Sequence, residues 1–194
     1  MTQPSTARSP FIVLTGGPGA GKTAILELAR RTMGKQVMLL PEAASILFGG
    51  GFWRRESIPG RKAAQRAIYY VQREQERMVT DEGGRFALCD RGTLDGLAYW
   101  PEALETFWKE LETTIADELG RYRAVIHLRT PAEGHGYNHQ NPLRTESGAA
   151  AHEIDERILR AWEAHPRRYI IDSTDDFMTK VQRTLKVIDA LANE

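Results

Sequence analysis

A glycine-rich stretch near the N-terminus constrains the fold of this chain more than any other part of its sequence. The stretch consists of Gly16, Gly17, Pro18, Gly19, Ala20, Gly21, Lys22 and Thr23. It fits the pattern G-x-x-x-x-G-K-[ST] at every required position and follows four apolar residues, 11–14, that suit a strand buried on both faces. Because glycine permits backbone conformations that other residues avoid, successive N–H groups can turn toward phosphate oxygens. The stretch therefore predicts a phosphate-binding loop between a buried strand and a helix.

Two side chains at the end of this loop have the chemistry that a bound nucleotide needs. Lys22 can reach the β- and γ-phosphates, and the hydroxyl group of Thr23 can become a ligand of Mg²⁺. The helix that follows adds the positive end of its dipole. The guanine-reading pattern N-K-x-D is absent from the sequence, so we expect ATP rather than GTP, together with Mg²⁺.

The size and charge of the chain limit what else it can do. Its 194 residues suffice for one well-packed domain, expected over residues 11–194 with a flexible tail at 1–10. Because Lys plus Arg equals Asp plus Glu, at 26 each, no overall positive field attracts nucleic acid or an anionic membrane. Neither a secretory leader nor a bilayer-spanning run is recognisable, so we expect a cytoplasmic location. The single cysteine, Cys89, lies in an apolar run and is expected in the core.

Apolar patterns along the chain alternate between strand and helix periods. Strands are predicted over residues 11–14, 36–40, 86–89, 122–128 and 168–171. Helical patterns follow the phosphate loop as far as Gly34, extend from 62 to 79, recur in pieces over 94–119, and return around 154–162 and 177–191. In the helix over 62–79, the predicted apolar stripe consists of Ala64, Ile68, Val71 and Met78. Such alternation predicts an α/β fold, a three-layer α/β/α sandwich around a five-stranded parallel sheet.

A polar residue follows each predicted strand. These residues are Thr15, Glu42, Asp90, Arg129 and Asp172. The carboxyl ends of parallel strands meet at one edge of a sheet, and ligands bind at that edge in such folds. We therefore expect the five residues to lie along the same edge as the phosphate loop.

Four residues near this edge are candidates for catalysis. Asp90 is placed to hold Mg²⁺, and Arg91 can face a transferred phosphoryl group or an acceptor hydroxyl group; the alternative is a surface ion pair between the two. Glu42 is the candidate general base, although a carboxylate there can also cap the N-terminus of a helix. Asp95 is a weaker candidate for the base, with an exposed turn as the alternative.

One long segment without apolar periodicity is a candidate lid. It covers about residues 130–148, and a loop of that length inside a compact domain usually has a function or is disordered. Arg144 can reach the γ-phosphate from this lid, because a delocalised guanidinium group suits the spreading charge of the transition state. The further candidates for that role are Arg129, Arg157 and Arg160.

A second segment, residues 49–60, contains three glycines followed by two aromatic and two arginine residues. It predicts either a mobile loop that closes over a ligand or an ordinary loop with its aromatic rings in the core. The residues expected to form an acceptor pocket are Glu42, Phe52, Trp53, Tyr70 and Arg91.

Several short motifs resemble a known group of proteins. PEAA at 41–44, DRGTLDGLAYW at 90–100 and NPLRTE at 141–146 are similar to the AAA-type ATPase and kinase-like domain related to bacterial nicotinamide riboside kinases. That domain belongs with the small P-loop kinases of the nucleoside and nucleotide kinase fold, and the resemblance spans about residues 10–192. It implies the P-loop NTPase fold, with Glu42 as base, Asp90 at Mg²⁺ and Arg91 near the acceptor hydroxyl group. Those kinases usually carry Glu-Arg-Ser where this chain has Asp90-Arg91-Gly92.

Together these features favour an ATP-dependent, Mg²⁺-requiring kinase that phosphorylates a hydroxyl group of a small, nucleoside-like acceptor. The expected catalytic residues are Lys22, Glu42, Asp90, Arg91 and Arg144, with Thr23 and Asp90 at the metal. The alternative is a nucleotide-binding switch that hydrolyses slowly and acts through a partner. A third hypothesis, a remodelling ATPase, would need a second helical domain. The sequence leaves the acceptor and the oligomeric state open.

Overall fold

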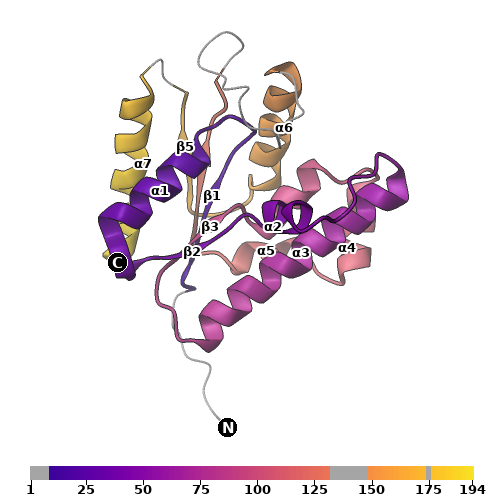
Figure 1. The fold of residues 1–194 in the computed structure, drawn as a ribbon, viewed down its shortest axis with the longest axis horizontal. Helices are drawn as coiled ribbons and strands as arrows, with labels where there is room; N and C mark the ends of the chain where they lie inside the picture. The colour runs from indigo at the N-terminus through magenta and orange to yellow at the C-terminus, as the bar shows by residue number, and fades with distance from the viewer. Residues whose placement is uncertain (1–8, 132–147, 174–175) are drawn as a thin grey trace.

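A five-stranded sheet forms the centre of the fold, and all of its strands run parallel (Figure 1). The computed structural model describes residues 9–131, 148–173 and 176–194. The strands are β1 (Phe11–Thr15), β2 (Met38–Leu40), β3 (Ala87–Asp90), β4 (Ala124–Leu128) and β5 (Arg168–Ile171). Their order across the sheet is β2-β3-β1-β4-β5. The strand that precedes the phosphate loop is therefore the central one.

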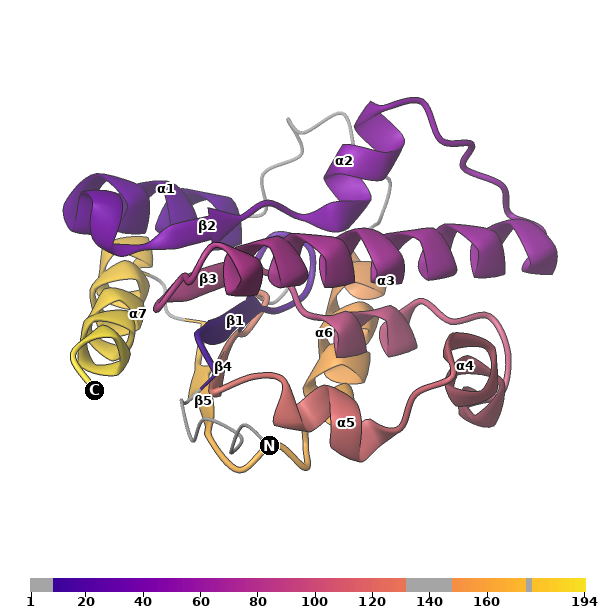
Figure 2. The same cartoon turned by 90° about the horizontal axis from the view of Figure 1, so that it is seen from below.

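Helices cover both faces of this sheet (Figures 1 and 2). They are α1 (Lys22–Met33), α2 (Ala43–Gly49), α3 (Ile58–Asp81), α4 (Leu104–Leu111), α5 (Ile115–Gly120), α6 (Gly148–Ala161) and α7 (Phe177–Ala192), with short 3-10 helices η1 (Gly34–Gln36) and η2 (Thr93–Ala98). Helices α1 and α7 lie on one face, and α3, α5 and α6 lie on the other. The predicted α/β fold with a five-stranded parallel sheet is confirmed.

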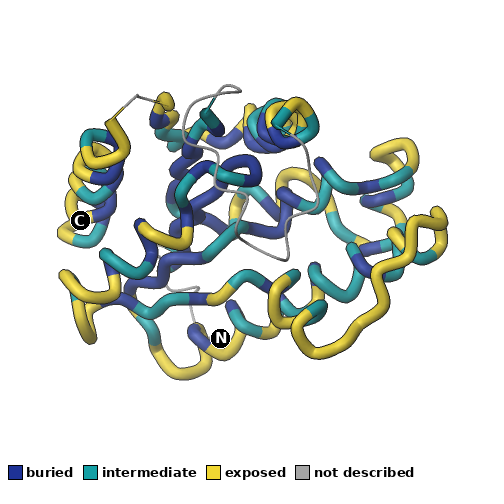
Figure 3. The backbone as a smooth tube through the Cα atoms, turned by 45° about the horizontal axis from the view of Figure 1, so that its top comes forward, coloured by how far each residue is buried: buried dark blue, intermediate teal, exposed yellow. Residues whose placement is uncertain are grey.

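The alternation of side chains along β1 divides the apolar core into two parts. Ile12 and Leu14 pack with residues of α1 and α7, whereas Phe11 and Val13 pack with residues of η2 and α6. Successive side chains of a strand point to opposite faces, so a strand between two helix layers is apolar at every position. Figure 3 shows the buried strands inside helices whose outer faces are exposed. Cys89 lies in the second core and is fully buried, which confirms its predicted place.

Most of the predicted elements are present, with boundaries set by local geometry. The second strand begins at Met38 rather than at residue 36 because residues 34–36 form η1. Gly34, with a φ of 55°, ends α1 as the sequence predicts. Helix α2 is not predicted by the sequence, because its seven residues run directly into further glycines and carry little periodicity.

Helix α3 starts earlier than predicted and turns a different face to the core. Ser57 caps it by accepting a hydrogen bond from the Gly60 N–H at 3.3 Å. Met78, part of the predicted apolar stripe, is 55% exposed. The buried residues of α3 are Ala64, Tyr69, Gln72, Glu76 and Val79. The stripe is therefore right for Ala64 and wrong for Met78. Hydrogen bonds satisfy the polar members of the buried face, which apolar periodicity alone does not show.

Two predicted segments fall largely outside the described residues. Of the expected N-terminal tail only residues 9 and 10 are described, and of the expected lid only Thr130, Pro131 and Gly148. Arg144 therefore lies outside the described residues, and its role stays a prediction. Within the described part of the chain, no helix has the length and apolar character needed to cross a membrane.

Gly92 occupies a position where the second core leaves no room for a side chain. A Cβ atom there would lie 2.8 Å from both the Trp162 ring and the Val13 side chain. We expect Gly92→Ser to lower the free energy of unfolding by about 1–3 kcal/mol, because a packed core resists added atoms. Urea unfolding measures the change, with Gly120→Ser as control, since nothing lies within 4 Å of a Cβ atom at Gly120. Equal stability of the two variants would contradict this packing.

Candidate functional site

The phosphate loop joins β1 to α1 in a conformation that requires glycine. Gly16 and Gly21 have φ angles of 136° and 94°. A Cβ atom at Gly16 would also lie 2.1 Å from the Leu128 carbonyl oxygen, so the loop passes closely over the end of β4. No side chain caps the start of α1, and its first turn carries no acidic residue. The first N–H groups of α1 are thus available to an anion.

Lys22 lies against the inside of this loop. Its Nζ donates hydrogen bonds to the carbonyl oxygens of Gly16 and Gly17 at 2.9 and 3.1 Å. Burial, together with the positive charge of Arg91, lowers the pKa of Lys22 to about 8, while the nearby carboxylates act in the opposite direction. An arriving phosphate group adds negative charge beside Nζ and therefore favours the protonated lysine.

The carboxyl edge of the sheet places the predicted polar residues in one row. Because all the strands are parallel, each of the five residues lies at the end of its strand or just after it on this edge; they are Thr15, Glu42, Asp90, Arg129 and Asp172. A cavity of about 790 Å³ opens beside the phosphate loop. The predicted site residues that line it are Pro18, Lys22, Thr23, Glu42, Asp90 and Arg91. Arg129 and Asp172 share the edge but do not line this cavity.

Asp90, the last residue of β3, presents a carboxylate without a hydrogen-bond partner. Its Oδ1 is buried and has no partner within the described structure. Burial raises the pKa of Asp90 to about 6, helped by the negative charge of Glu42 and opposed by Lys22. Thr23, which lines the same cavity, carries the other side-chain oxygen available there. An unsatisfied carboxylate beside a hydroxyl group fits the oxygen chemistry of Mg²⁺, so these two residues would hold the ion.

Arg91 is fixed by acceptors on three sides. Its Nε donates to Glu42 Oε1 at 2.7 Å, and its Nη1 donates to Asp95 Oδ2 at 3.0 Å and to the Gly16 carbonyl oxygen at 3.3 Å. Its φ of 75° lies in the left-handed region, which is unusual for a residue other than glycine. The alternative of an ion pair with Asp90 is therefore wrong: Arg91 turns to Glu42 and Asp95 instead.

Glu42 follows β2 and is held as a carboxylate. Burial raises its pKa, but the charge of Arg91, the hydroxyl group of Ser45 and the charge of Lys22 outweigh burial and lower it to about 2. Glu42 occupies the N-cap position of α2, yet its side chain accepts no hydrogen bond from the helix backbone. Its carboxylate accepts hydrogen bonds from Ser45 and Arg91 instead. Glu42 therefore stands at the N-cap position, as the alternative predicts, but its side chain does not cap the helix.

Asp95, the weaker candidate for the base with an exposed turn as the alternative, is a buried part of the site. It is 3% exposed, so that alternative was wrong. Besides Arg91, it accepts hydrogen bonds from Thr15 Oγ1 at 2.6 Å and from the Trp162 indole N–H at 2.7 Å. With both carboxylate oxygens engaged, Asp95 positions Arg91 and is not free to act as a base. Its spacing of four residues from Arg91 is the signal that sequence reasoning missed.

The cavity continues away from the phosphate loop along one face of α3. The lining side chains of this chamber are Ala64, Gln65, Ile68, Tyr69, Gln72, Tyr99 and Phe107. Tyr69 is held in place, because its hydroxyl group donates to the buried carboxylate of Glu118 at 2.7 Å. The chamber therefore offers aromatic and aliphatic surface, with two amide groups, to a second ligand beside the nucleotide site.

Three of the five residues predicted for an acceptor pocket lie elsewhere. Tyr70 is 53% exposed, because the neighbouring Tyr69 faces the cavity at this point of the helix. Phe52 and Trp53 belong to the exposed segment between α2 and α3, and they line a separate shallow depression. Only Glu42 and Arg91 of that predicted set line the cavity. The alternative with these rings in the core is therefore wrong, because both rings are exposed. Closure of residues 49–60 over a ligand stays a prediction.

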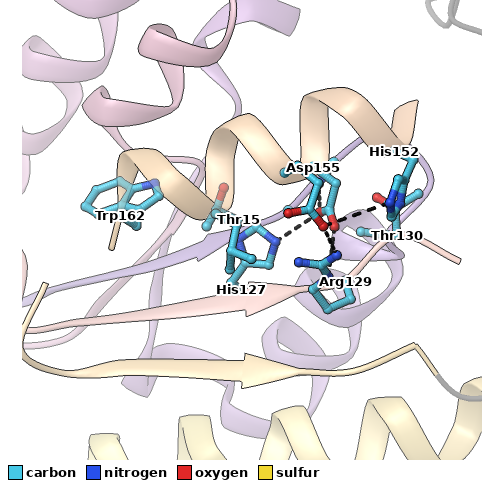
Figure 4. Close-up of polar contacts among 12 residues, drawn as sticks. Thr15, His127, Arg129, Thr130, His152, Asp155 and Trp162 are labelled. Carbon is cyan, nitrogen blue, oxygen red and sulfur yellow. Dashed lines mark hydrogen bonds and ion pairs between the residues drawn. The ribbon is translucent and has the colours of Figure 1, made fainter. Parts of the chain in front are cut away.

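A buried ionic cluster holds the outside of the phosphate loop (Figure 4). Asp155, on α6, accepts the Gly17 N–H at 2.8 Å through Oδ1. The same oxygen lies 2.9 Å from His127 Nε2 on β4, and Oδ2 lies 3.1 Å from Arg129 Nε. Asp155 and His127 are both completely buried. Two signals in the sequence were missed: a histidine within an apolar strand, and an aspartate on the apolar face of a helix.

Two further side chains hold the carbonyl groups of the loop. Lys180, on α7, donates to the Ala20 carbonyl oxygen at 2.8 Å and to the Arg129 carbonyl oxygen at 2.6 Å. Burial lowers the pKa of Lys180 to about 8. Thr130 Oγ1 donates to the Pro18 carbonyl oxygen at 3.3 Å. The loop is thus held from behind by β4, α6 and α7, while its inner side faces the cavity.

The arginines predicted to reach the γ-phosphate point elsewhere within the described structure. Arg129 pairs with Asp155 and Glu156. Arg157 donates to Glu153 at 2.6 Å on the surface of α6, and Arg160 is exposed on the same helix. None of the three lines the cavity. These three further candidates are therefore wrong for the arrangement seen here.

The comparison with known families agrees with this geometry. A family model described as an AAA domain matches residues 11–180. The chain belongs to the AAA domain family. Membership of this P-loop NTPase-like family indicates nucleotide binding and hydrolysis for the AAA domain, and it agrees with the parallel sheet and the phosphate loop described above. No curated protein sequence shows a significant match to the chain.

Asp90 makes the stability of the nucleotide-free AAA domain depend on pH. Its pKa is about 6 in the folded domain, against an ordinary value of 3.8. The folded state therefore binds the proton more tightly, and the charged carboxylate costs about 3 kcal/mol above pH 6, a cost that disappears as the pH falls toward 4. We expect Asp90→Asn to raise the free energy of unfolding by up to that amount at about pH 7.5 and to weaken its pH dependence. Urea unfolding without Mg²⁺ measures both.

Asp95→Asn is the matched control at the same sheet edge. The carboxylate of Asp95 accepts from Thr15, Arg91 and Trp162, and an amide group turns one of these acceptors into a donor. We expect this control to lose stability at the pH at which Asp90→Asn gains it. A loss of stability in both variants would show that the charge on Asp90 does not destabilise the folded state.

Asp155 is expected to stabilise both the fold and the phosphate loop. Asp155→Asn removes the charge that holds His127 and Arg129, and breaking a buried pair typically costs about 3–5 kcal/mol. The control is Glu156→Gln, which removes the other, half-exposed partner of Arg129 and is expected to cost below about 1 kcal/mol. Urea unfolding of the two variants checks this difference, and similar values for both would contradict a special role for Asp155.

Proposed function

We propose that this AAA domain is an ATP-dependent, Mg²⁺-requiring kinase that phosphorylates a hydroxyl group of a small, nucleoside-like molecule. The acceptor oxygen attacks the γ-phosphorus of ATP, a new P–O bond forms, and the bond between the γ-phosphorus and the β,γ-bridging oxygen breaks. The acceptor proton passes to a carboxylate of the site, and ADP leaves. The partners in this proposal are ATP and a small acceptor, without nucleic acid or membrane.

The observation that carries the proposal is the shape of the cavity. It begins at Lys22 and Thr23 of the phosphate loop and continues past Glu42 into the chamber along α3. Its volume is about 790 Å³, within the range of sites that enclose a whole small molecule. An enzyme that only hydrolyses ATP needs a water molecule at this point, not an apolar chamber. The chamber is therefore explained by a second substrate placed in line with the γ-phosphate.

Glu42 is the residue placed best to meet the acceptor hydroxyl group. Its carboxylate is oriented by Arg91 and Ser45 at the junction of the phosphate site and the chamber. Its pKa of about 2 makes it a weak base before substrates bind. In phosphoryl transfer the bond to the leaving group is largely broken in the transition state, so orienting the hydroxyl group matters more than early removal of its proton. Glu42 accepts that proton late in the reaction.

Lys22, Arg91 and Arg144 stabilise negative charge in this proposal. Lys22 lies beside the loop that holds the β- and γ-phosphates, and Arg91 faces the junction where the phosphoryl group moves. Arg144, which lies outside the described residues, is the candidate for the remaining positive charge at the γ-phosphate. Bound Mg²⁺, held through Thr23 and Asp90, would neutralise the phosphate oxygens and orient them.

The test is ADP formation with and without a panel of small hydroxylated acceptors. We expect Lys22→Ala to lose most of its turnover, because the charge on the β- and γ-phosphates is then uncompensated. We expect Glu42→Gln to keep the wild-type affinity for Mg·ATP, measured by calorimetry, and to lose acceptor-dependent turnover by about 10²–10⁴-fold. Glu82→Gln, on the exposed end of α3, is the control and should behave as wild type.

The same assay separates the kinase from the alternative functions. Slow ADP formation that no acceptor accelerates would contradict the kinase and favour a nucleotide-dependent switch. Unchanged transfer in Glu42→Gln would move the role of base to Asp90, whose free oxygen and pKa of about 6 suit a base.

A further inference from the structure

The two ends of the cavity differ in charge. The charged lining residues near the phosphate loop are Lys22, Arg91, Glu42, Asp90 and Asp95. Those at the opening, on the exposed segment before α3 and on its first turn, are Arg54, Arg55, Glu56 and Arg61. Carboxylates outnumber cations at the inner end, and cations outnumber carboxylates at the opening. We call Arg54, Arg55 and Arg61 the arginine cluster.

Helix α3 sets the distance between these two ends. Arg61, Gln65 and Gln72 line the cavity from one face of this helix. A helix rises 1.5 Å per residue, so Arg61 lies about 16 Å from Gln72 along the axis. Gln72 lies close to Cys89, the residue that precedes Asp90. A ligand whose hydroxyl group lies at Glu42 therefore reaches the arginine cluster only with its far end.

The arginine cluster lacks carboxylate partners in the described part of the structure. The other four cations of α3 each form an ion pair with a carboxylate: Lys62 with Glu102 and Glu110, Arg66 with Glu110, Arg73 with Glu118, and Arg77 with Glu74 and Asp81. Arg61 is the exception on this helix. The other cations of α3 are thus neutralised by carboxylates of the protein itself, whereas those at the opening are left to a ligand.

All three members of the cluster are nevertheless oriented, Arg55 by the Trp53 ring, whose centre lies 4.9 Å from the guanidinium carbon. The Arg54 guanidinium group lies over the Phe48 ring, 4.1 Å from its centre, and Phe48 also lines the cavity. Arg61 Nη2 donates to the Tyr99 carbonyl oxygen at 3.2 Å. A guanidinium group held by one such contact keeps its other N–H donors for an anion and loses less entropy on binding.

We infer that the acceptor carries an anionic group, a carboxylate or a phosphate monoester, at the end opposite its reacting hydroxyl group. The inference rests on the proposed kinase function and names the substrate class of that site. The arginine cluster binds the anion, and the chamber between Ile68, Tyr69 and Phe107 contacts the carbon skeleton. In the proposed reaction the cations of the inner end are occupied by the phosphates of ATP, so the arginine cluster is the cationic part of the cavity left for the acceptor's anion, and it orients the hydroxyl group toward the γ-phosphate.

The test compares two fluorescent probes with the same aromatic rings. Anilinonaphthalene sulfonate carries an anionic group, and phenylnaphthylamine lacks it. The protein is first saturated with Mg²⁺ and a non-hydrolysable ATP analogue, so that the phosphate loop is occupied and only the chamber and its opening remain. We expect the sulfonate to bind about tenfold more tightly than the neutral probe, which corresponds to about 1.4 kcal/mol. Equal affinities, or no saturable binding of the sulfonate, would overturn the inference.

Matched variants assign this preference to the cluster. In the double variant Arg54→Gln/Arg61→Gln we expect the tenfold ratio to fall close to one, while the affinity of the neutral probe stays unchanged. Arg77→Gln, on the same helix but paired with Glu74 and Asp81, is the control and should keep the ratio. A ratio that survives in the double variant, or that falls equally in the control, would show that the cluster is not the anion site.

Competition then distinguishes the two sources of the anion. Inorganic phosphate and acetate are added to the sulfonate complex at constant ionic strength. Stronger displacement by phosphate indicates a phosphate monoester, and stronger displacement by acetate indicates a carboxylate. Displacement by neither would overturn the inference. These measurements need no turnover, so an anion preference without acceptor-dependent ADP formation would remove the kinase and leave the anion site.

Discussion

A phosphate-binding loop must keep its backbone in one conformation while leaving its inward N–H groups without partners, and the rest of this structure depends on meeting both demands. Asp155 accepts the Gly17 amide N–H from the outer side of the loop. Lys180 and Thr130 hold the carbonyl groups of Ala20 and Pro18. The loop is therefore shaped by contacts on its outer side, from β4, α6 and α7. Its inner side is free for an anion because its own geometry is already satisfied elsewhere.

Glu42 and Asp90 show how one sheet edge keeps two neighbouring carboxylates in different states. Arg91 donates to Glu42 and holds its pKa at about 2, whereas burial without a partner raises the pKa of Asp90 to about 6. The difference begins with the left-handed backbone of Arg91, which turns its guanidinium group toward β2 and η2. Environments that separate the pKa values of paired carboxylates are typical of sites where the two have different roles. In the proposed kinase, one orients the acceptor and the other holds the metal.

The sequence predicts the parts of this molecule that local patterns encode. The phosphate loop follows from the spacing of its glycines, and the sheet follows from five apolar runs, because such patterns act over a few residues. Asp95 and Asp155 could not be placed in the site in this way, since their partners Trp162 and Gly17 are far away in the chain. Tyr69 rather than Tyr70 lines the cavity because of which face α3 turns to the core. The sequence does not show this face, because several of its buried residues are polar. Local sequence patterns do not encode hydrogen bonds between distant residues or the face that a helix turns to the core.

The burial of Cys89 has a practical consequence for following the motions of this domain. Its side chain is completely inaccessible in the centre of β3, and burial raises the pKa of its thiol well above the usual range. Only the thiolate reacts with alkylating reagents, so the folded state protects this group twice, by access and by charge. As the chain contains a single cysteine, the rate of its alkylation reports the opening of the central sheet without any introduced label. A bound nucleotide that stabilises this edge of the sheet therefore lowers the rate at which Cys89 is alkylated.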